Sequence, residues 1–422
     1  MAKRLQTTPT ARERPEPSGL VTTRRGADAL AFSLMLIFVT GAITLTLMPV
    51  VTQDLQDRFG YSAADIGLMT SVFLGFYGVS GITSGVFAAR WGGRLLAVSC
   101  GCFVVGSAIF GLSTTFAGFL IGRSIQGIGG GMVVATCSPV MAYALPPERL
   151  GRAWGIFGSG WGLGTVLGLF IMPSIDKAGG FRAVFLTTAG LGLVVGIAAL
   201  SQKAVRILPQ HPVGATTLRG LARSLGAVVR NHRVMLLAFT NTAALAIGVG
   251  LLQWAPGLLE HIHGTTESFS FYLVAIGLGA AQLFGNPAGA AVAGRWGKYA
   301  TIMISLVLMT VFAVLVGIVP GVVLAFAMVL LTGFFSMFFF APMLAYIPEV
   351  VAKPEQVGAA TGMNTLLGFA GSMVAPWLFG LLLDAGNGSR NAYLWGFVML
   401  AAFGVASTVG MLLFGASRKR TA

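Results

Sequence analysis

The sequence predicts an all-α polytopic membrane protein, with twelve membrane-spanning helices in two related six-helix halves. Its mean hydropathy is +0.84 and 9% of its residues are charged, whereas a soluble domain has roughly 25% charged residues. Its apolar runs have about 20 residues, the length of helix that crosses a bilayer core. Arg90-Trp91-Gly92 recurs as Arg295-Trp296-Gly297, each time in a short basic turn between two apolar runs.

Other motifs also recur in the same order in the second half of the chain. The pairs are Gly81/Gly85 with Gly285/Gly289, Pro139/Tyr143 with Pro342/Tyr346, Gly151/Gly155 with Gly358/Gly362, and Asp176/Arg182 with Asp384/Arg390. Collinear matches at a nearly constant offset indicate a duplicated unit. We therefore expect two pseudo-symmetric bundles.

The apolar runs predict helices rather than strands. Backbone amides in hydrocarbon need internal partners, and a barrel strand has only about 9 to 11 residues. We expect spans near residues 28–50, 64–87, 95–113, 116–144, 152–174, 183–202, 234–257, 270–292, 300–319, 322–346, 358–383 and 393–415.

Polar segments divide the chain into five parts. These are a basic cytoplasmic tail (1–26), a first six-helix bundle (27–202), a cytoplasmic linker (203–233), a second six-helix bundle (234–415) and a cytoplasmic tail (416–422). The linker is the longest polar interruption, and Arg219 to Arg230 is suited to an amphipathic helix on the inner membrane surface. The polar start of the chain does not resemble a cleaved signal peptide.

The distribution of positive charge predicts the orientation. All but five of the 27 Lys and Arg residues lie on the side of the two termini, the exceptions being Arg58, Lys177, Arg182, Arg390 and the intramembrane Arg123. Basic loops remain cytoplasmic, so we expect both termini inside, in the plasma membrane or the inner membrane of a bacterium. The net charge of +14 thus indicates topology and no nucleic-acid partner.

The turn between the second and third spans carries a family motif. Residues 85–94, Gly-Val-Phe-Ala-Ala-Arg-Trp-Gly-Gly-Arg, resemble the Gly-x-Leu-Ala-Asp-Arg-x-Gly-Arg-Arg turn of the major facilitator superfamily, with Ala89 in place of the acid. In that family the acid helps to latch the outward-open state, so the resemblance implies a latch that is weaker here or that uses the backbone and Arg90 alone. It assigns conformational roles to Gly85, Arg90, Gly92 and Arg94, and to their counterparts Arg295, Gly297 and Lys298.

Spans four and five extend the resemblance. Residues 123–129, Arg-Ser-Ile-Gln-Gly-Ile-Gly, resemble the family's Arg-x-x-Gln-Gly-x-Gly pattern, and residues 160–168 are similar to its Gly-xxx-Gly-Pro-xx-Gly-Gly antiporter signature. Thr165 replaces the Pro, which weakens an antiporter assignment. Gly127, Gly160 and Gly164 are expected to let helices pack closely and shift against one another.

The resemblance implies two six-helix bundles related by an axis along the membrane normal, with a solute site between them near mid-membrane. Spans one, four, seven and ten are expected to line that site. The implied function is secondary active transport of a small solute by alternating access, coupled to protons or another ion, by a monomer in the lipid bilayer.

Arg123 is the leading candidate for solute binding. Placing a charged side chain inside the hydrocarbon region costs at least about 2.5 kcal/mol, so its presence there indicates a functional or structural role. In the functional interpretation Arg123 pairs with an anionic group of the solute; in the structural one it donates hydrogen bonds to backbone carbonyls of neighbouring helices. No carboxylate is placed at mid-membrane, which favours an anionic or neutral solute over a cationic drug.

Other polar residues of the spans are weaker candidates, and the alternative role of each is a hydrogen bond to a neighbouring helix. The predicted solute-binding set, besides Arg123, is Gln126, Thr40, Thr44, Asn241, Gln253 and Asn364, with Trp254 as an apolar wall. For proton coupling, the titratable groups near the outer mouth are Asp54, Glu260, His261 and His263.

Other function classes lack their motifs. The stretch 294–299 has neither the glycine spacing nor the Ser or Thr of a P-loop. The positions of His and carboxylates give no intramembrane catalytic or metal site, so we expect no enzyme, no metal and no cofactor. Efflux of hydrophobic compounds by antiport, and a membrane sensor that no longer transports, remain alternatives.

Overall fold

The computed structural model describes residues 23–91, 93–202, 205, 218–351 and 356–419, and this part of the chain is helical without strands. Ten of its helical segments are long and apolar enough to cross a membrane. One of them, Arg152–Ser201, contains two spans, and α4 provides one more. The described residues therefore contain the twelve spans that the sequence predicts.

The first half consists of α1 to α5. Their bounds are α1 Arg24–Phe59, α2 Ala63–Trp91, α3 Arg94–Leu112, α4 Phe116–Ala144 and α5 Pro147–Ser201. Local chemistry fixes several ends: the Thr23 and Thr115 hydroxyls cap α1 and α4 by accepting backbone N–H bonds, and Gly60 ends α1 with a φ of 69°.

The second half follows α7 Leu218–Arg230. This helix is the amphipathic helix expected in the linker. It contains α8 His232–His261, α9 Glu267–Val274, η1 Ala275–Ala280, α10 Ala281–Trp296, α11 Lys298–Ile318, α12 Val322–Phe338, α13 Phe340–Val350, α14 Val357–Ser372, α15 Val374–Ala385 and α16 Arg390–Lys419. Span eight is the continuous run α9–η1–α10, whose middle is a π-helix that the sequence reading did not predict.

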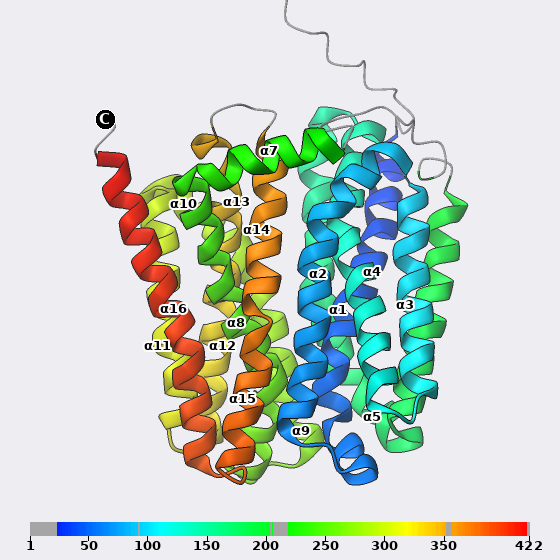
Figure 1. Ribbon diagram of the computed structural model, residues 1–422, viewed down its shortest axis with the longest axis vertical. Coiled ribbons are helices and arrows are strands. Elements are labelled where there is room, and N and C mark those ends of the chain that lie inside the picture. The colour runs from blue at the N-terminus through cyan, green and yellow to red at the C-terminus, as the bar shows by residue number, and fades with distance from the viewer. Residues whose placement is uncertain (1–22, 92, 203–204, 206–217, 352–355, 420–422) are drawn as a thin grey trace, which may run out of the picture.

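The two halves stand side by side, and α7 lies across one end of them (Figure 1). We call this the α7 end, where the described part of α16 also finishes, and the opposite one the α9 end. α2 contacts α14 and α15, α5 contacts α9, η1 and α10, and α1 contacts α8. These pairs form the seam between the halves.

Glycines let the halves approach closely along this seam. A Cβ on Gly67 of α2 would lie 2.3 Å from the carbonyl oxygen of Pro376 in α15, and a Cβ on Gly380 would lie 2.3 Å from that of Ala63. Real Cβ atoms do not approach oxygen so closely, so glycine is required at both positions. Small residues serve membrane helices in this way because the backbones can then come into direct contact.

Gly180 turns the chain between spans five and six, where α5 loses helical geometry. Its φ of 69° and ψ of −174° belong to a region that is essentially restricted to glycine. A Cβ there would also lie 2.6 Å from Nη2 of Arg58 and 2.9 Å from Oδ2 of Asp54. The Asp54 carboxylate accepts the N–H of Phe181 at 2.8 Å, which anchors the turn against the end of α1.

We expect Gly180→Ala to destabilise the protein by roughly 1–3 kcal/mol through backbone strain. Thermal unfolding of the purified protein in detergent measures this as a lower melting temperature. Gly190→Ala is the matched control, because a Cβ at this helical position meets nothing within 4 Å. An equal melting temperature for both variants would show that the turn tolerates a side chain.

Candidate functional site

Arg123 is fully buried in the first half, on α4. Its Nη1 donates to the carbonyl oxygen of Thr44 at 2.9 Å and to Oε1 of Gln126 at 2.9 Å, and its Nε donates to the carbonyl oxygen of Met69 at 3.4 Å. The guanidinium carbon lies 4.3 Å from the centre of the Phe73 ring. Carbonyl dipoles and a ring face therefore surround the positive charge.

No carboxylate bonds Arg123 within the described part of the chain, and its Nη2 lacks a hydrogen-bond partner there. The carbonyl contacts of the structural interpretation are thus present, and one donor remains free. A buried donor without a partner costs about 1–3 kcal/mol, and more when it is charged. The guanidinium therefore retains unused capacity for an acceptor.

Gln126, Thr44 and Thr40 lie on the same network. Gln126 accepts from Arg123 and donates through Nε2 to the Ser107 hydroxyl at 2.8 Å. The Thr44 and Thr40 hydroxyls donate within their own helix, to the carbonyls of Thr40 and Leu36. The structure thus joins Arg123 to Gln126 and α1, while the two threonine hydroxyls already have acceptors.

Gln253 and Trp254 lie on α8 towards the α9 end. The Thr70 hydroxyl of α2 donates to Oε1 of Gln253 at 3.0 Å, and Nε2 of Gln253 lies 3.5 Å from the Thr52 hydroxyl of α1. Gln253 therefore connects the halves. Trp254 stacks on Phe379 with ring centres 5.6 Å apart, and its buried indole nitrogen has no partner among the described residues.

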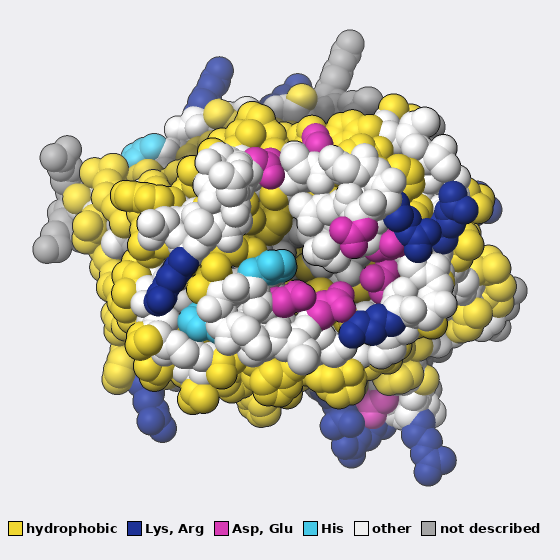
Figure 2. Space-filling view, turned by 90° about the horizontal axis from the view of Figure 1, so that it is seen from below, with side chains coloured by type: hydrophobic (Ala, Val, Ile, Leu, Met, Phe, Trp, Pro, Cys, Tyr) yellow, Lys and Arg dark blue, Asp and Glu magenta, His cyan; other side chains and the backbone are white. Residues whose placement is uncertain are grey.

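A cavity of about 460 Å³ opens above Gln253 and Trp254, at the α9 end. We call it the α9-end vestibule. Glu260, His261 and Asp384 belong to its lining. Figure 2 shows this face with a hollow at its centre, bordered by acidic side chains and a histidine. The vestibule is thus polar and mainly acidic at its rim.

Asn241 and Asn364 form a third group, inside the second half. Nδ2 of Asn241 donates to the carbonyl oxygen of Asn364 at 3.2 Å, and the buried Oδ1 of Asn364 has no partner among the described residues. No hydrogen bond among the described residues joins this pair to Arg123 or Gln253. The predicted solute-binding residues therefore fall into three separate groups.

Gln282 and Asn286 on α10 were missed by the sequence reading. Their side-chain oxygens are buried and lack partners among the described residues. The two residues are four apart, on the helix face that also includes Gly279 and Leu283. A Cβ on Gly279 would lie 2.8 Å from Val166 of α5, so this face looks towards the first half. The Gln-xxx-Asn spacing in an apolar run was the available signal.

Asp384 was also missed, although its pairing with Asp176 in the repeat was visible. Its two carboxylate oxygens accept the backbone N–H groups of Ala63 and Ala64, each at 2.8 Å. These amides open α2 of the other half, where a carboxylate also suits the helix dipole. On the other side of the seam, Lys177 donates to the Ser268 hydroxyl at 2.7 Å and lies 3.3 Å from Glu267. Both contacts hold the halves together at the α9 end.

The predicted conformational residues are only partly described. Gly92 lies outside the described residues, as do the side chains of residues 85–90. Arg94 begins α3 and Arg295 lies in the last turn of α10. Gly297 separates α10 from α11 with a φ of 82°, and Lys298 contacts Glu349 and the carbonyl of Ala345.

The three glycines of spans four and five contact backbone atoms. A Cβ would lie 2.4 Å from the carbonyl oxygen of Phe73 at Gly127, 3.0 Å from that of Met35 at Gly160 and 2.6 Å from that of Val39 at Gly164. They thus allow close helix packing within the first half; their part in movement stays a prediction.

Comparison with known proteins decides the family. The Major Facilitator Superfamily pattern matches residues 30–281 and 255–422. The chain belongs to the major facilitator superfamily. The fold is shared with a bacterial homologue of the human lysosomal transporter Spinster, in an inward-facing and occupied conformation, which superimposes with a TM-score of 0.73 at 18% identity, covering 92% of this chain and 96% of that one.

Relatives that match this chain over most of its length include two transporters. The hexuronate transporter of Bacillus subtilis is 25% identical over 86% of this chain and 90% of its own. The probable anion transporter 6 of Arabidopsis thaliana is 23% identical over 94% and 79%. The match to the tetracenomycin C resistance and export protein of Streptomyces glaucescens is local: it is 30% identical over 44% of this chain, which spans 36% of that relative's length.

Proposed function

We propose that this superfamily member is a secondary transporter that moves a small organic anion by alternating access. The observation that carries the proposal is Arg123, a buried guanidinium with a free Nη2 and no carboxylate bonded to it among the described residues. A carboxylate or phosphate of the solute would supply the missing acceptor and countercharge. The names of the hexuronate transporter and the probable anion transporter support the same solute class.

The contacts across the seam support a mechanism. At the α9 end the halves are joined through Asp384, Gln253 and Lys177. To open the α9-end vestibule towards Arg123, these contacts have to break while α1 and α2 move relative to α8 and α15. The solute would then replace part of the carbonyl shell of Arg123. This differential binding is what shifts a population between two states.

We place the α7 end in the cytoplasm, on the side of the basic loops. Proton coupling is proposed at the α9 end, through Asp54, Glu260, His261 and His263. Glu260 and His261 belong to the lining of the α9-end vestibule, and Asp54 holds the turn at Phe181. Burial, and secondarily the charge of Arg390, lowers the pKa of His263, because both disfavour the imidazolium.

Solute flux is the direct test. The purified protein is reconstituted into proteoliposomes, and uptake of labelled galacturonate is measured beside lactate, inorganic phosphate and neutral galactose. We expect saturable uptake of at least one anion and no uptake by protein-free vesicles. Uptake of galactose alone would contradict the anionic assignment, and binding without flux of any probe would favour the sensor alternative.

The amides of α10 provide a prediction on specificity. Gln282→Ala and Asn286→Ala should each raise the KM for the transported solute about tenfold, because each removes a buried acceptor that we assign to hydroxyl donors of the solute. Phe284→Ala on the same helix is the control, since that side chain is 69% exposed on the outer surface of the bundle. Unchanged KM values in both amide variants would exclude them from the solute site.

A further inference from the structure

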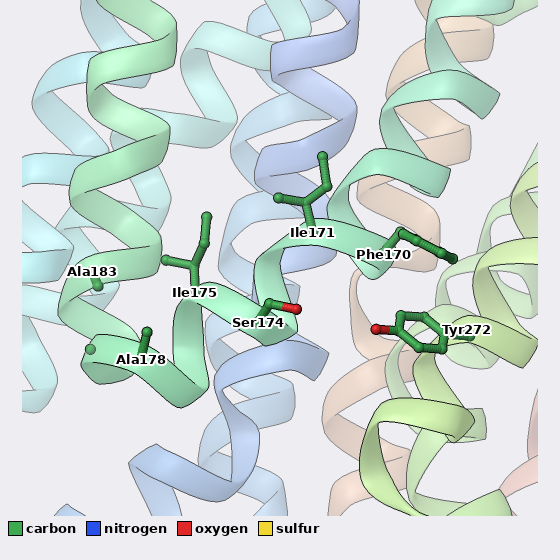
Figure 3. A pocket seen from close by; sticks show the side chains of 8 residues that line it. Phe170, Ile171, Ser174, Ile175, Ala178, Ala183 and Tyr272 are labelled. Carbon is green, nitrogen blue, oxygen red and sulfur yellow. The ribbon is translucent and has the colours of Figure 1, made fainter.

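A groove lies on the outer surface of the bundle, across the seam between α5 and α9. Its volume is about 530 Å³, and its apolar wall includes Phe170, Ile171 and Ile175. Phe170 and Ile171 are 47% and 45% exposed. Figure 3 shows the side chains that line it. Because the twelve spans cross a bilayer, this surface faces lipid.

The groove is hollow because small residues form its floor. Ala178, Gly179 and Ala183 line it near the turn that joins spans five and six. Tyr272 of α9 forms the facing wall and holds its ring 4.4 Å from that of Phe170. One wall thus belongs to each half of the protein.

Two hydroxyl groups interrupt the apolar lining. The side chains of Ser174 and Tyr272 point towards one another across the groove (Figure 3). A hydroxyl that faces hydrocarbon without a partner is unfavourable, and tyrosine is enriched where the hydrocarbon meets the headgroups. An ester-linked lipid presents carbonyl oxygens at this depth, where the two hydroxyls can donate to them.

A positive charge lies at the end of the same helix face. Lys177 follows Ser174 by three residues, the spacing that places both on one side of α5. Its side chain is 52% exposed although it lies 3.3 Å from Glu267. Arg182, next to the groove residue Ala183, is also exposed. Along the groove, the apolar wall is followed by the two hydroxyl groups and then by the cations. A phospholipid has its acyl chain, its ester groups and its phosphate in the same order.

We propose that this groove binds a phospholipid of the adjoining leaflet. One acyl chain lies along Phe170, Ile171 and Ile175, the ester carbonyls accept from Ser174 and Tyr272, and the phosphate lies beside Lys177. A lipid that contacts both walls stabilises the contact between α5 and α9. The proposal does not depend on which solute is transported.

Native mass spectrometry of the full-length protein tests the site, with dioleoyl phosphatidylglycerol titrated into delipidated samples. Ala178→Trp fills the groove and should weaken binding of the first lipid about tenfold, the equivalent of losing roughly two buried methylene groups. Val194→Trp, at a 65% exposed position elsewhere on α5, should leave the affinity unchanged. Equal affinities in these two variants would overturn the proposal.

Milder variants keep the test decisive even where Ala178→Trp fails to fold. Tyr272→Phe and Ser174→Ala should each weaken the same lipid severalfold. Lys177→Gln should weaken phosphatidylglycerol but leave dioleoylglycerol, which lacks the phosphate, unaffected. Wild-type affinity in all three variants would overturn the site. Movement of labelled phosphatidylglycerol between leaflets by the wild type would also overturn it, since the lipid would then be cargo.

Discussion

Replacing Arg123 by Lys or Met is expected to abolish uptake, with a loss of at least about a hundredfold in kcat/KM. Removing one partner of a buried ion pair costs roughly 3–5 kcal/mol, and the proposed partner is the solute anion. Lys retains the charge but lacks the planar guanidinium, whose Nη1 donates to the Thr44 carbonyl and the Gln126 side-chain oxygen while its Nε donates to the Met69 carbonyl. Initial rates of uptake into proteoliposomes measure the effect.

A purely structural role for Arg123 predicts a different result. In that case the melting temperature would fall together with flux, because the contacts to Thr44 and Met69 would be the source of the loss. On our proposal Arg123→Met retains the melting temperature, since the charge that it removes is buried and no carboxylate of the described residues is bonded to it. Arg152→Gln, which breaks an exposed ion pair with Asp28, is the control and should leave uptake unchanged. Full uptake by Arg123→Met would exclude the anchor role.

Asp384→Asn should open the α9 end. The substitution removes the negative charge that accepts the N–H groups of Ala63 and Ala64, and hydrogen bonds to charged groups contribute about 1.5–3 kcal/mol each. Loss of part of this energy shifts the population towards the state in which the vestibule extends to Arg123. We expect a cysteine introduced as Gln56→Cys, in the vestibule lining, to react about tenfold faster with a membrane-impermeant maleimide.

Asp57→Asn provides the matched control for this experiment. Asp57 lies at the same end of the protein, and its carboxylate accepts from Gln53 of its own helix at 3.0 Å. Its loss should leave the labelling rate unchanged, because this contact does not join the halves. Equal rates in the Asp384 and Asp57 variants would mean that the carboxylate of Asp384 does not hold the α9 end closed.

Hydrophobicity and glycine chemistry explain why the spans were predictable. An apolar run in a bilayer forms a helix because only then are its backbone groups hydrogen-bonded, and glycine-containing breaks, such as the one around Gly180, separate successive runs. The π-helix at Ala275–Ala280 was not predictable, because it depends on how α9 and α10 pack against α5 and α12. Hydrophobic periodicity identifies the buried face of a helix. It does not show where a π-helix, with about one more residue per turn, replaces an α-helix.

The candidate site divides in the same way. The free-energy cost of burying Arg123 was predictable from its residue type. Its carbonyl partners on α1 and α2 were not, because they depend on the tertiary structure. The sequence identified Asp384 only as the repeat counterpart of Asp176, because its hydrogen-bond partners are more than 300 residues away in the chain. Repeat symmetry marked the residue, and only the assembled halves reveal which helix it caps.

The π-helical segment η1 sets the direction in which Gln282 and Asn286 point. An ordinary α-helix advances about 100° per residue, so a change of one residue in the winding turns every later side chain by that angle. If η1 changes from a π-helix to an α-helix while α9 stays in place, both amides rotate away from α5. A change of helical pitch confined to six residues would then turn the side-chain amides of Gln282 and Asn286 towards or away from α5 without unfolding the span.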